Sequence, residues 1–166
     1  NTDIAGFELA MRHVKFSLEG KQVLIIGAGG VVPSIIVALK NLKVSKIKIM
    51  NRTYEKALKL SNLYKNIQVI KWAESTNFDM IINATSLGLN NETIDLNTFN
   101  IGQGKFFYDV IYNPNETNFL KLGKKLGNQI ENGKLMFIYQ AFEAFKLWHD
   151  QEPIVNKEIL NLLNND

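Results

Sequence analysis

VLIIGAGG, residues 23–30, is the stretch that decides the fold of this chain. A short apolar run of strand type ends on three glycines and leads into a helix-like stretch at residues 31–42. Gly27 permits the tight turn, Gly29 leaves room for a pyrophosphate, and the next helix offers unpaired N–H groups. The turn therefore predicts a phosphate-binding junction made of Gly27, Ala28, Gly29, Gly30 and Val31. The alternative is a plain strand-to-helix turn, because Val32 stands at the third position of the usual G-x-G-x-x-G.

The next predicted strand, residues 46–50, ends in Asn51, Arg52 and Thr53, where a dinucleotide fold normally has an acid against the ribose hydroxyls. An acid there would repel a 2′-phosphate, whereas a guanidinium can hold it with a charge-assisted fork. Lys56, one helical turn later, directs a second cation to the same side. The pattern predicts NADP as the cofactor, with these four residues among its ligands. The alternatives are that Thr53 is only the N-cap of the next helix and that Lys56 is only a solvated lysine.

Composition sets bounds on the class of protein. The 166-residue chain is 46% hydrophobic, which fits one domain, residues 1–166, with a sizeable core. A net charge of +3, spread along the chain, suits an anionic cofactor better than a nucleic acid. With no cysteine, and with His13 and His149 far apart, the sequence predicts no disulfide and no metal site. No stretch has the length of a membrane span or the order of a signal peptide, so we expect a cytoplasmic protein without a membrane partner.

The rest of the chain alternates between strand and helix patterns. Strands are predicted at residues 23–26, 46–50, 67–70, 80–83, 106–111 and 129–131, and helices at residues 7–16, 31–42, 54–64, 118–126, 135–148 and 156–163. This alternation predicts an α/β fold with a doubly wound, mainly parallel Rossmann-type sheet flanked by helices. Ligands of such sheets bind at the carboxyl ends of the strands, where this chain has the polar stretches 51–53, 83–86 and 112–113.

Motifs along nearly the whole chain carry a resemblance to a known family. They are NTDIAGF at the start, the GAGG turn, NRT, NATSLG, YDVIYNPNETNFL and GKLMFIYQAFEAFKLW. In this order and spacing they resemble the C-terminal, NADP-binding domain of the shikimate dehydrogenase family. The resemblance implies a two-domain enzyme that uses NADPH to reduce 3-dehydroshikimate reversibly to shikimate, in the chorismate pathway of aromatic amino-acid biosynthesis. It also implies an N-terminal substrate domain, preceding this chain, that supplies a catalytic lysine.

The resemblance implies roles for single residues. Asp3 matches the catalytic aspartate that works with the lysine on the substrate hydroxyl, and Ile4 follows it where the family usually has glycine. Tyr112 and Gln140 match substrate contacts, and residues 1–16 and 133–166 match helices that border the substrate cleft. The further implied cofactor contacts are Asn83, Thr85, Ser86, Val110, Gly133 and Met136.

Each of these implied roles has a structural alternative. Asp3 could be a helix N-cap, residues 83–86 a turn closed by their own hydroxyls, and Met136 a core residue. On the last long helix we expect Leu135, Ile138, Phe142 and Phe145 to form a buried stripe, and Trp148 to pack. Asp109 is expected to be structural.

The sequence leaves more than one function open. The first is the cofactor domain of an NADP-dependent shikimate dehydrogenase, a fragment that binds NADP but is inactive alone. The second is a paralogue that acts on quinate with NAD, or on another hydroxy acid, although Arg52 and Lys56 argue against NAD. The third is a non-catalytic module that senses NADP.

Overall fold

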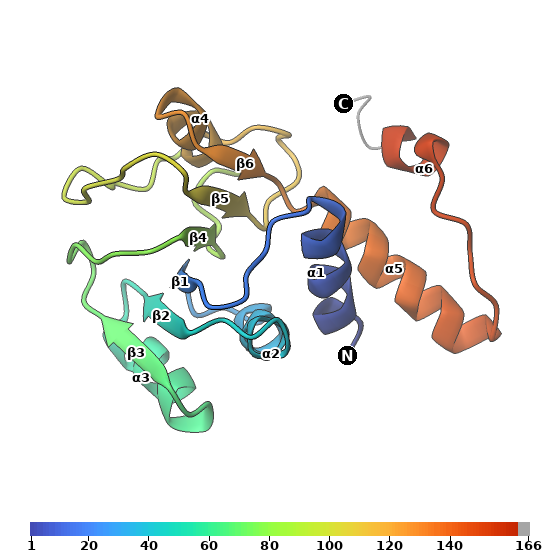
Figure 1. Cartoon of the computed structure of the whole chain (residues 1–166), viewed down its shortest axis with the longest axis horizontal. Coiled ribbons are helices and arrows are strands. Elements are labelled where there is room, and N and C mark those ends of the chain that lie inside the picture. Colours follow the sequence, from blue (N-terminus) through green and yellow to red (C-terminus); the bar gives the residue numbers. More distant parts are fainter. Residues whose placement is uncertain (163–166) are drawn as a thin grey trace.

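The computed structural model describes residues 1–162, and its centre is a six-stranded sheet with the order β3-β2-β1-β4-β5-β6 (Figure 1). The strands are β1 (Gln22–Ile26), β2 (Lys46–Met50), β3 (Ile67–Ile70), β4 (Met80–Asn83), β5 (Phe106–Asp109) and β6 (Gln129–Glu131). All neighbouring strands pair in parallel. The predicted doubly wound, Rossmann-type sheet is confirmed. Because the strand order reverses between β1 and β4, a crevice for a ligand is expected at their carboxyl ends.

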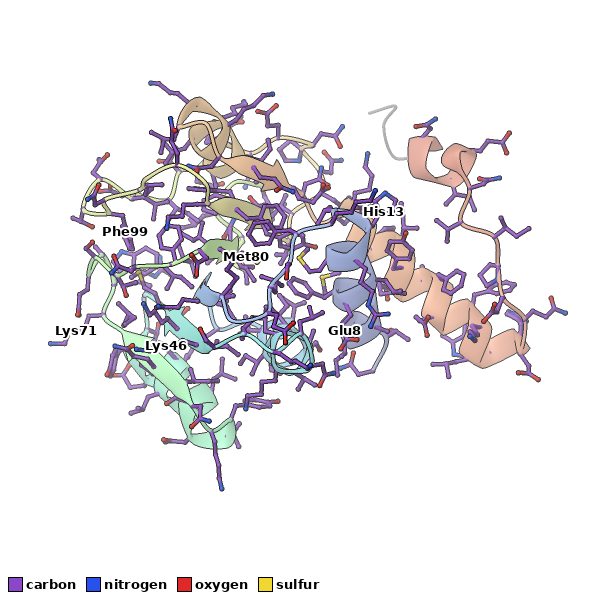
Figure 2. All side chains as sticks on the ribbon, viewed as in Figure 1. Glu8, His13, Lys46, Lys71, Met80 and Phe99 are labelled. Atoms are coloured by element: carbon purple, nitrogen blue, oxygen red, sulfur yellow. The ribbon has the colours of Figure 1, made fainter. Side chains whose placement is uncertain are left out.

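Helices cover the two faces of the sheet unequally. They are α1 (Thr2–His13), α2 (Val32–Asn41), α3 (Tyr54–Leu63), α4 (Asn118–Lys125), α5 (Lys134–His149) and α6 (Lys157–Leu162). One face packs against α1, α2, α3 and the first turns of α5. The other packs against α4 and the irregular segment 84–105, from which Ile94, Leu96 and Phe99 enter the core. Side chains fill the space around the sheet, with Met80 inside and Lys71 at the edge (Figure 2).

The central strands β1, β4 and β5 are buried on both faces, which explains their nearly continuous apolar runs, whereas the edge strands β3 and β6 are only partly buried. Four of the five residues of β1 are buried, as are four of the five of β2. Lys48 is a buried cation in β2, and its Nζ donates to Thr76 Oγ1 over 3.0 Å and to the carbonyl oxygen of Asn77. Burial lowers the pKa of this ammonium group. Lys48 therefore fastens the connection between β3 and β4 to the sheet.

The first helix differs from its prediction. It begins at Thr2 and not at residue 7, and it ends at His13 and not at residue 16. The side chain of Asn1 caps it by accepting a hydrogen bond from the Asp3 backbone N–H over 2.9 Å. The apolar periodicity that predicted this helix starts only at Phe7, whereas the cap extends the helix over the more polar turn before it.

The expected buried stripe on α5 is wrong in its second half. Leu135 and Ile138 are buried, but Phe142 is half-buried and Phe145 is 39% exposed. Trp148, expected to pack, is 78% exposed. The cause is visible in Figure 1, where α5 runs past α1 and away from the sheet. The predicted last helix is present as α6, and its residue 163 lies outside the described residues.

Across residues 1–162, no helix combines the length and the apolar character needed to cross a membrane.

Candidate functional site

The glycine turn after β1 lies at the crevice between β1 and β4. Gly27 has φ +118°, and a Cβ there would lie 2.5 Å from the carbonyl oxygen of Ala84, so only glycine fits. Its backbone N–H donates to the carbonyl oxygen of Met50 over 2.8 Å. The turn therefore touches the ends of β2 and β4. The helix α2 then begins at Val32, and the first backbone N–H groups of this helix lack partners within it.

A polar pocket of about 280 Å³ opens beside this turn, and we call it the glycine-turn pocket. Its lining residues are Gly27, Ala28, Gly29, Asn51, Arg52, Thr53, Lys56, Ala84, Thr85 and Ser86. The structure thus brings together residues predicted separately after β1, β2 and β4. The lining holds two cationic side chains and no carboxylate. Gly30 and Asn83 are outside this lining.

The segment after β2 leaves its polar groups available to the pocket. Thr53 occupies the N-cap position of α3, but its side chain makes no capping hydrogen bond. Asn51 Nδ2 donates to the carbonyl oxygen of Thr53 over 2.7 Å and so braces the turn. Arg52 and Lys56 are exposed and line the same pocket, as their helical spacing predicted.

Trp72 is a site residue that the sequence analysis missed. A neighbouring pocket of about 240 Å³ shares Asn51, Arg52, Thr85 and Ser86 with the glycine-turn pocket, and Trp72 and Leu87 complete it. Trp72 is 39% exposed and stands two residues after the end of β3. Its position just past a strand end, at the edge of the sheet where ligands bind, was the signal that could have found it.

Asn83 supports the loop that follows β4. Its Oδ1 accepts from the backbone N–H and the hydroxyl of Thr85 over 3.0 and 2.7 Å. Its Nδ2 donates to the carbonyl oxygen of Leu87 and to Asp109 Oδ1, both over 3.0 Å. The side chain is fully buried, and these bonds use both amide protons and both acceptor positions. The turn-type bonding expected as the alternative is present, while Thr85 and Ser86 also line the glycine-turn pocket.

A second pocket, of about 300 Å³, lies on the other side of the glycine turn, and we call it the α1–α5 pocket. Its lining residues are Asp3, Val31, Val110, Tyr112, Gly133, Met136, Phe137 and Gln140. The predicted catalytic residue and both predicted substrate contacts therefore share one pocket with four predicted cofactor contacts. Val31 directly follows the glycine turn, so the turn separates the two pockets.

A close helix crossing brings Asp3 to this pocket. A Cβ on Gly6 would lie 2.8 Å from the carbonyl oxygen of Met136 and 2.9 Å from the backbone nitrogen of Gln140. Asn1 Nδ2 also donates to Ser34 Oγ of α2 over 3.0 Å, which holds the start of α1 in place. The N-cap is Asn1, so the N-cap alternative for Asp3 is wrong. Ile4, where the family usually has glycine, packs against the core within an unbroken helix.

Phe137 is the second residue that the sequence analysis missed. Its ring stacks on Tyr112 with the ring centroids 4.8 Å apart and the planes at 23°. Both rings are partly exposed, at 40% and 37%. Met136, Phe137 and Gln140 recur at helical spacing on one face of α5, and that spacing could have revealed Phe137. The stack fixes one wall of the pocket beside Gln140.

The chain has detectable relatives in sequence. Residues 8–106 match the family described as Shikimate / quinate 5-dehydrogenase. The chain is 53% identical to the shikimate dehydrogenase (NADP(+)) of Pelagibacter ubique (strain HTCC1062) over 165 residues, which cover 99% of this chain and 62% of that protein. The chain thus spans less than two thirds of the length of this relative.

Solved structures share the fold. Shikimate 5-dehydrogenase from Thermus thermophilus, in complex with NADP(H) and shikimate, superposes with a TM-score of 0.83 at 27% identity, covering 93% of this chain and 58% of that one. Quinate dehydrogenase from Corynebacterium glutamicum, in complex with NAD, superposes with a TM-score of 0.86 at 26% identity, covering 99% of this chain and 62% of that one.

Proposed function

The chain belongs to the shikimate / quinate 5-dehydrogenase family, and from this premise we propose that it is the C-terminal, NADP-binding domain of a shikimate dehydrogenase. The whole protein would reduce 3-dehydroshikimate reversibly to shikimate with NADPH, a step of aromatic amino-acid biosynthesis. The observation that carries the proposal is that the glycine turn, Arg52 and Lys56 line one pocket without a carboxylate. A relative of 53% identity whose name specifies NADP(+) supports it.

The chemistry of the two pockets fits the two ends of NADP. We infer that the glycine turn, with Gly27, Ala28 and Gly29 in the pocket and Gly30 and Val31 leading into α2, holds the pyrophosphate, and that Arg52 and Lys56, with Asn51 and Thr53, hold the 2′-phosphate. The loop Thr85–Ser86 would border the cofactor between the pockets, supported from below by Asn83. The nicotinamide end would lie against Val31, Val110, Gly133 and Met136 in the α1–α5 pocket. When bound, NADP supplies the hydride acceptor for the oxidation of shikimate.

The polar groups of the α1–α5 pocket can orient a substrate. The Asp3 carboxylate would accept a hydrogen bond from the hydroxyl that becomes the carbonyl, and the lysine of the substrate domain would share that proton. Tyr112 and Gln140 offer a phenol and an amide to the other hydroxyls or to the carboxylate of shikimate. Met136 and Phe137 would give the reacting atoms an apolar wall. The length that the chain lacks relative to its relatives would include the lysine-bearing domain.

Arg52→Ala tests the cofactor assignment. A charge-assisted hydrogen bond contributes about 1.5–3 kcal/mol, so the dissociation constant for NADP should rise roughly 10- to 150-fold while that for NAD stays unchanged. Calorimetric titration of both nucleotides measures this. Lys59→Ala is the matched control, because Lys59 is an exposed cation of α3 outside the lining of the glycine-turn pocket. Equal losses for NADP and NAD would contradict the proposal.

A quinate dehydrogenase bound to NAD shares this fold and therefore defines a second candidate function. If this chain had that function, the wild-type protein would bind NAD more tightly than NADP. At full length it would oxidise quinate faster than shikimate. The two cations of the glycine-turn pocket favour the first candidate, because NAD has no 2′-phosphate for them to bind. The same titration separates the two candidates.

A further inference from the structure

Asp109, the last residue of β5, is a fully buried carboxylate that lines neither pocket. Its Oδ1 accepts hydrogen bonds from Asn83 Nδ2 and from the Ile111 backbone N–H, both over 3.0 Å. Its Oδ2 accepts from the Thr117 hydroxyl over 2.6 Å. Burial raises the pKa of this carboxyl, and the three donors oppose that shift. The side chain acts as an acceptor in every one of these bonds.

One of these bonds leads to the glycine-turn pocket. Asn83, the donor to Oδ1, holds both the backbone and the hydroxyl of Thr85 and also binds the carbonyl oxygen of Leu87. Thr85 and its neighbour Ser86 line the glycine-turn pocket. Asp109 fixes the amide of Asn83, because a carboxylate can only accept and so faces the Nδ2 group. The position of the loop after β4 therefore depends on Asp109.

The other two bonds lead to the α1–α5 pocket. They join Asp109 to the two ends of the loop after β5, at Ile111 and Thr117. Val110 and Tyr112, on either side of Ile111, line the α1–α5 pocket. One carboxylate therefore closes this loop by binding both of its ends.

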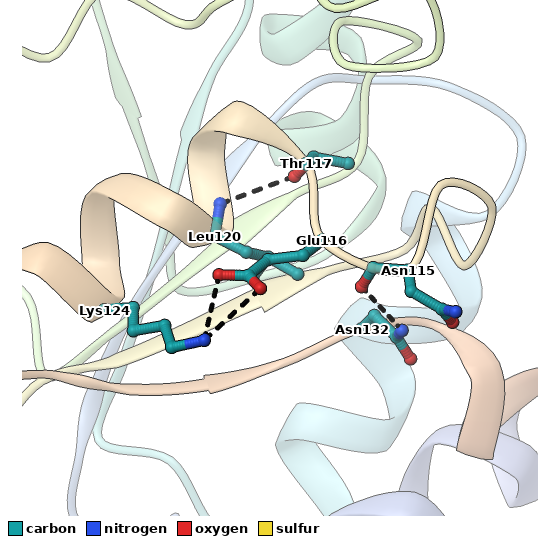
Figure 3. A network of polar contacts seen from close by, with 6 residues as sticks. All are labelled: Asn115, Glu116, Thr117, Leu120, Lys124 and Asn132. Atoms are coloured by element: carbon teal, nitrogen blue, oxygen red, sulfur yellow. Dashed lines mark hydrogen bonds and ion pairs between the residues drawn. The ribbon is translucent and has the colours of Figure 1, made fainter. Parts of the chain in front are cut away.

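The far end of that loop is held independently. Thr117 is the N-cap of α4, and its Oγ1 accepts from the Leu120 backbone N–H over 3.4 Å (Figure 3). The hydroxyl proton is therefore directed at Asp109. Figure 3 also shows the outer anchors of the loop, where Asn132 Nδ2 donates to the carbonyl oxygen of Asn115 over 2.9 Å and Lys124 pairs with Glu116 over 3.3 Å.

The two loops also touch directly. A Cβ built on Gly88, at the end of the first loop, would lie 3.2 Å from Thr117 Cβ and 3.4 Å from Ile111 Cδ1. A shift of either loop would therefore press on the other, because packed interiors transmit small displacements. The Asp109 bonds and this contact make the two loops one mechanical unit.

We propose that Asp109 is a positioning residue that couples NADP binding in the glycine-turn pocket to shikimate binding in the α1–α5 pocket. This rests on the proposed function of both pockets. A ligand that orders one loop also orders the other through Asp109. The second ligand then loses less conformational entropy on binding. The coupling is reciprocal: each ligand tightens the other by the same factor.

The coupling factor is measurable in the full-length protein that carries this chain. It is the dissociation constant of NADP⁺ without shikimate divided by that with saturating shikimate. We expect a factor of about 5- to 150-fold in the wild type, and a value within about twofold of one in Asp109→Leu, because a leucine of similar shape accepts none of the three hydrogen bonds. Thr117→Ser keeps the hydroxyl and should keep the factor. Ile81→Val trims the core beneath the loops without touching these bonds, and it should lower the melting temperature while keeping the factor.

The outcomes separate this proposal from the proposed function. Wild-type protein that binds no NADP or oxidises no shikimate contradicts the proposed function and, with it, the coupling. Wild-type protein that binds both ligands with a factor of one leaves the function standing and overturns the coupling. Asp109→Leu that melts earlier but keeps the wild-type factor shows a purely structural role and overturns it too. If Asp109→Leu does not fold, Thr117→Val removes the Oδ2 bond together with the cap on the Leu120 N–H, and an unchanged factor there has the same meaning.

Discussion

The glycine-turn pocket and the α1–α5 pocket flank the same turn but are built in different ways. The first is formed by short segments that directly follow β1, β2 and β4, and it carries exposed polar and cationic side chains. The second joins the start of α1 to α5 and to the loop after β5, across more than a hundred residues of sequence, and apolar groups predominate in it. A parallel sheet thus collects local motifs at one edge, whereas the second pocket also needs the close crossing of two helices at Gly6.

The largest expected effect concerns the α1–α5 pocket, which we predict to be catalytically incomplete in this chain. The 166-residue chain should bind NADP but not oxidise shikimate, because the lysine would come from another domain. In the longer protein, Asp3→Asn should lower kcat by about 10²- to 10⁴-fold and leave NADP affinity unchanged, as expected for loss of proton handling. NADPH absorbance follows the turnover. Glu8→Gln is the control, because Glu8 lies on the same helix and contacts Asn41 over 2.7 Å outside the pocket.

Two results would break this assignment. Turnover by the 166-residue chain alone at about ten per second, a typical enzyme rate, would refute the need for a second domain. Asp3→Asn that lowers the melting temperature but retains kcat would leave Asp3 with a structural role in the first turn of α1.

A smaller effect tests whether the two pockets hold different ligands. Gln140→Ala, in the full-length protein, should raise the KM for shikimate up to about 10-fold, the scale of one hydrogen bond, without changing NADP affinity. Tyr139→Phe is the matched control, because the neighbouring Tyr139 hydroxyl contacts His13 over 2.8 Å and lies outside the pocket. Weaker NADP binding in Gln140→Ala would show that this face of α5 contacts the cofactor.

Tryptophan fluorescence should show which pocket the nucleotide occupies, and the test requires no substitution of a proposed ligand contact. Trp72 lines the pocket next to the glycine-turn pocket, whereas Trp148 is 78% exposed near the end of α5. These are the two tryptophans of the chain. NADP binding should change the tryptophan fluorescence of the wild type and of Trp148→Phe, and the change should vanish in Trp72→Phe. A fluorescence change that persists in Trp72→Phe would show that the nucleotide binds away from this pocket.

The smallest expected effect is on stability and arises in β6, just before α5 begins. Glu131 of β6 is half-buried, and burial raises its pKa above the ordinary value of 4.5. The folded state therefore takes up a proton more readily than the unfolded state, so this contribution to stability is present below pH 4.5 and is lost as the pH rises through the folded value. Glu131→Gln should raise the melting temperature at pH 7 and have little effect near pH 4. Melting curves at both pH values decide this, and an equal shift at each would contradict it.

Much of the fold was predictable because strand patterns alternate with helix patterns along the chain. Strand-type patterns at residues 46–50, 67–70, 80–83 and 129–131 predicted β2, β3, β4 and β6 with their observed bounds. Prediction failed where burial depends on what lies opposite. Phe145 and Trp148 have the pattern of a packed helix, yet α5 extends beyond α1 and leaves them exposed. The start of α1 was missed because the side chain of Asn1, and not periodicity, sets it.

The glycine turn and the cationic segment after β2 could be recognised from the sequence, because each depends on residues that are neighbours along the chain. Gly27 and Arg52 are examples, since the motif around each residue predicted its place in the glycine-turn pocket. The folded chain was needed to show that Trp72 lies next to the glycine-turn pocket, that Phe137 stacks on Tyr112 in the α1–α5 pocket, and that Asp109 joins the loops of both. Such contacts join residues far apart in sequence, and their distances are set by how helices and loops pack on the sheet, which no local pattern records.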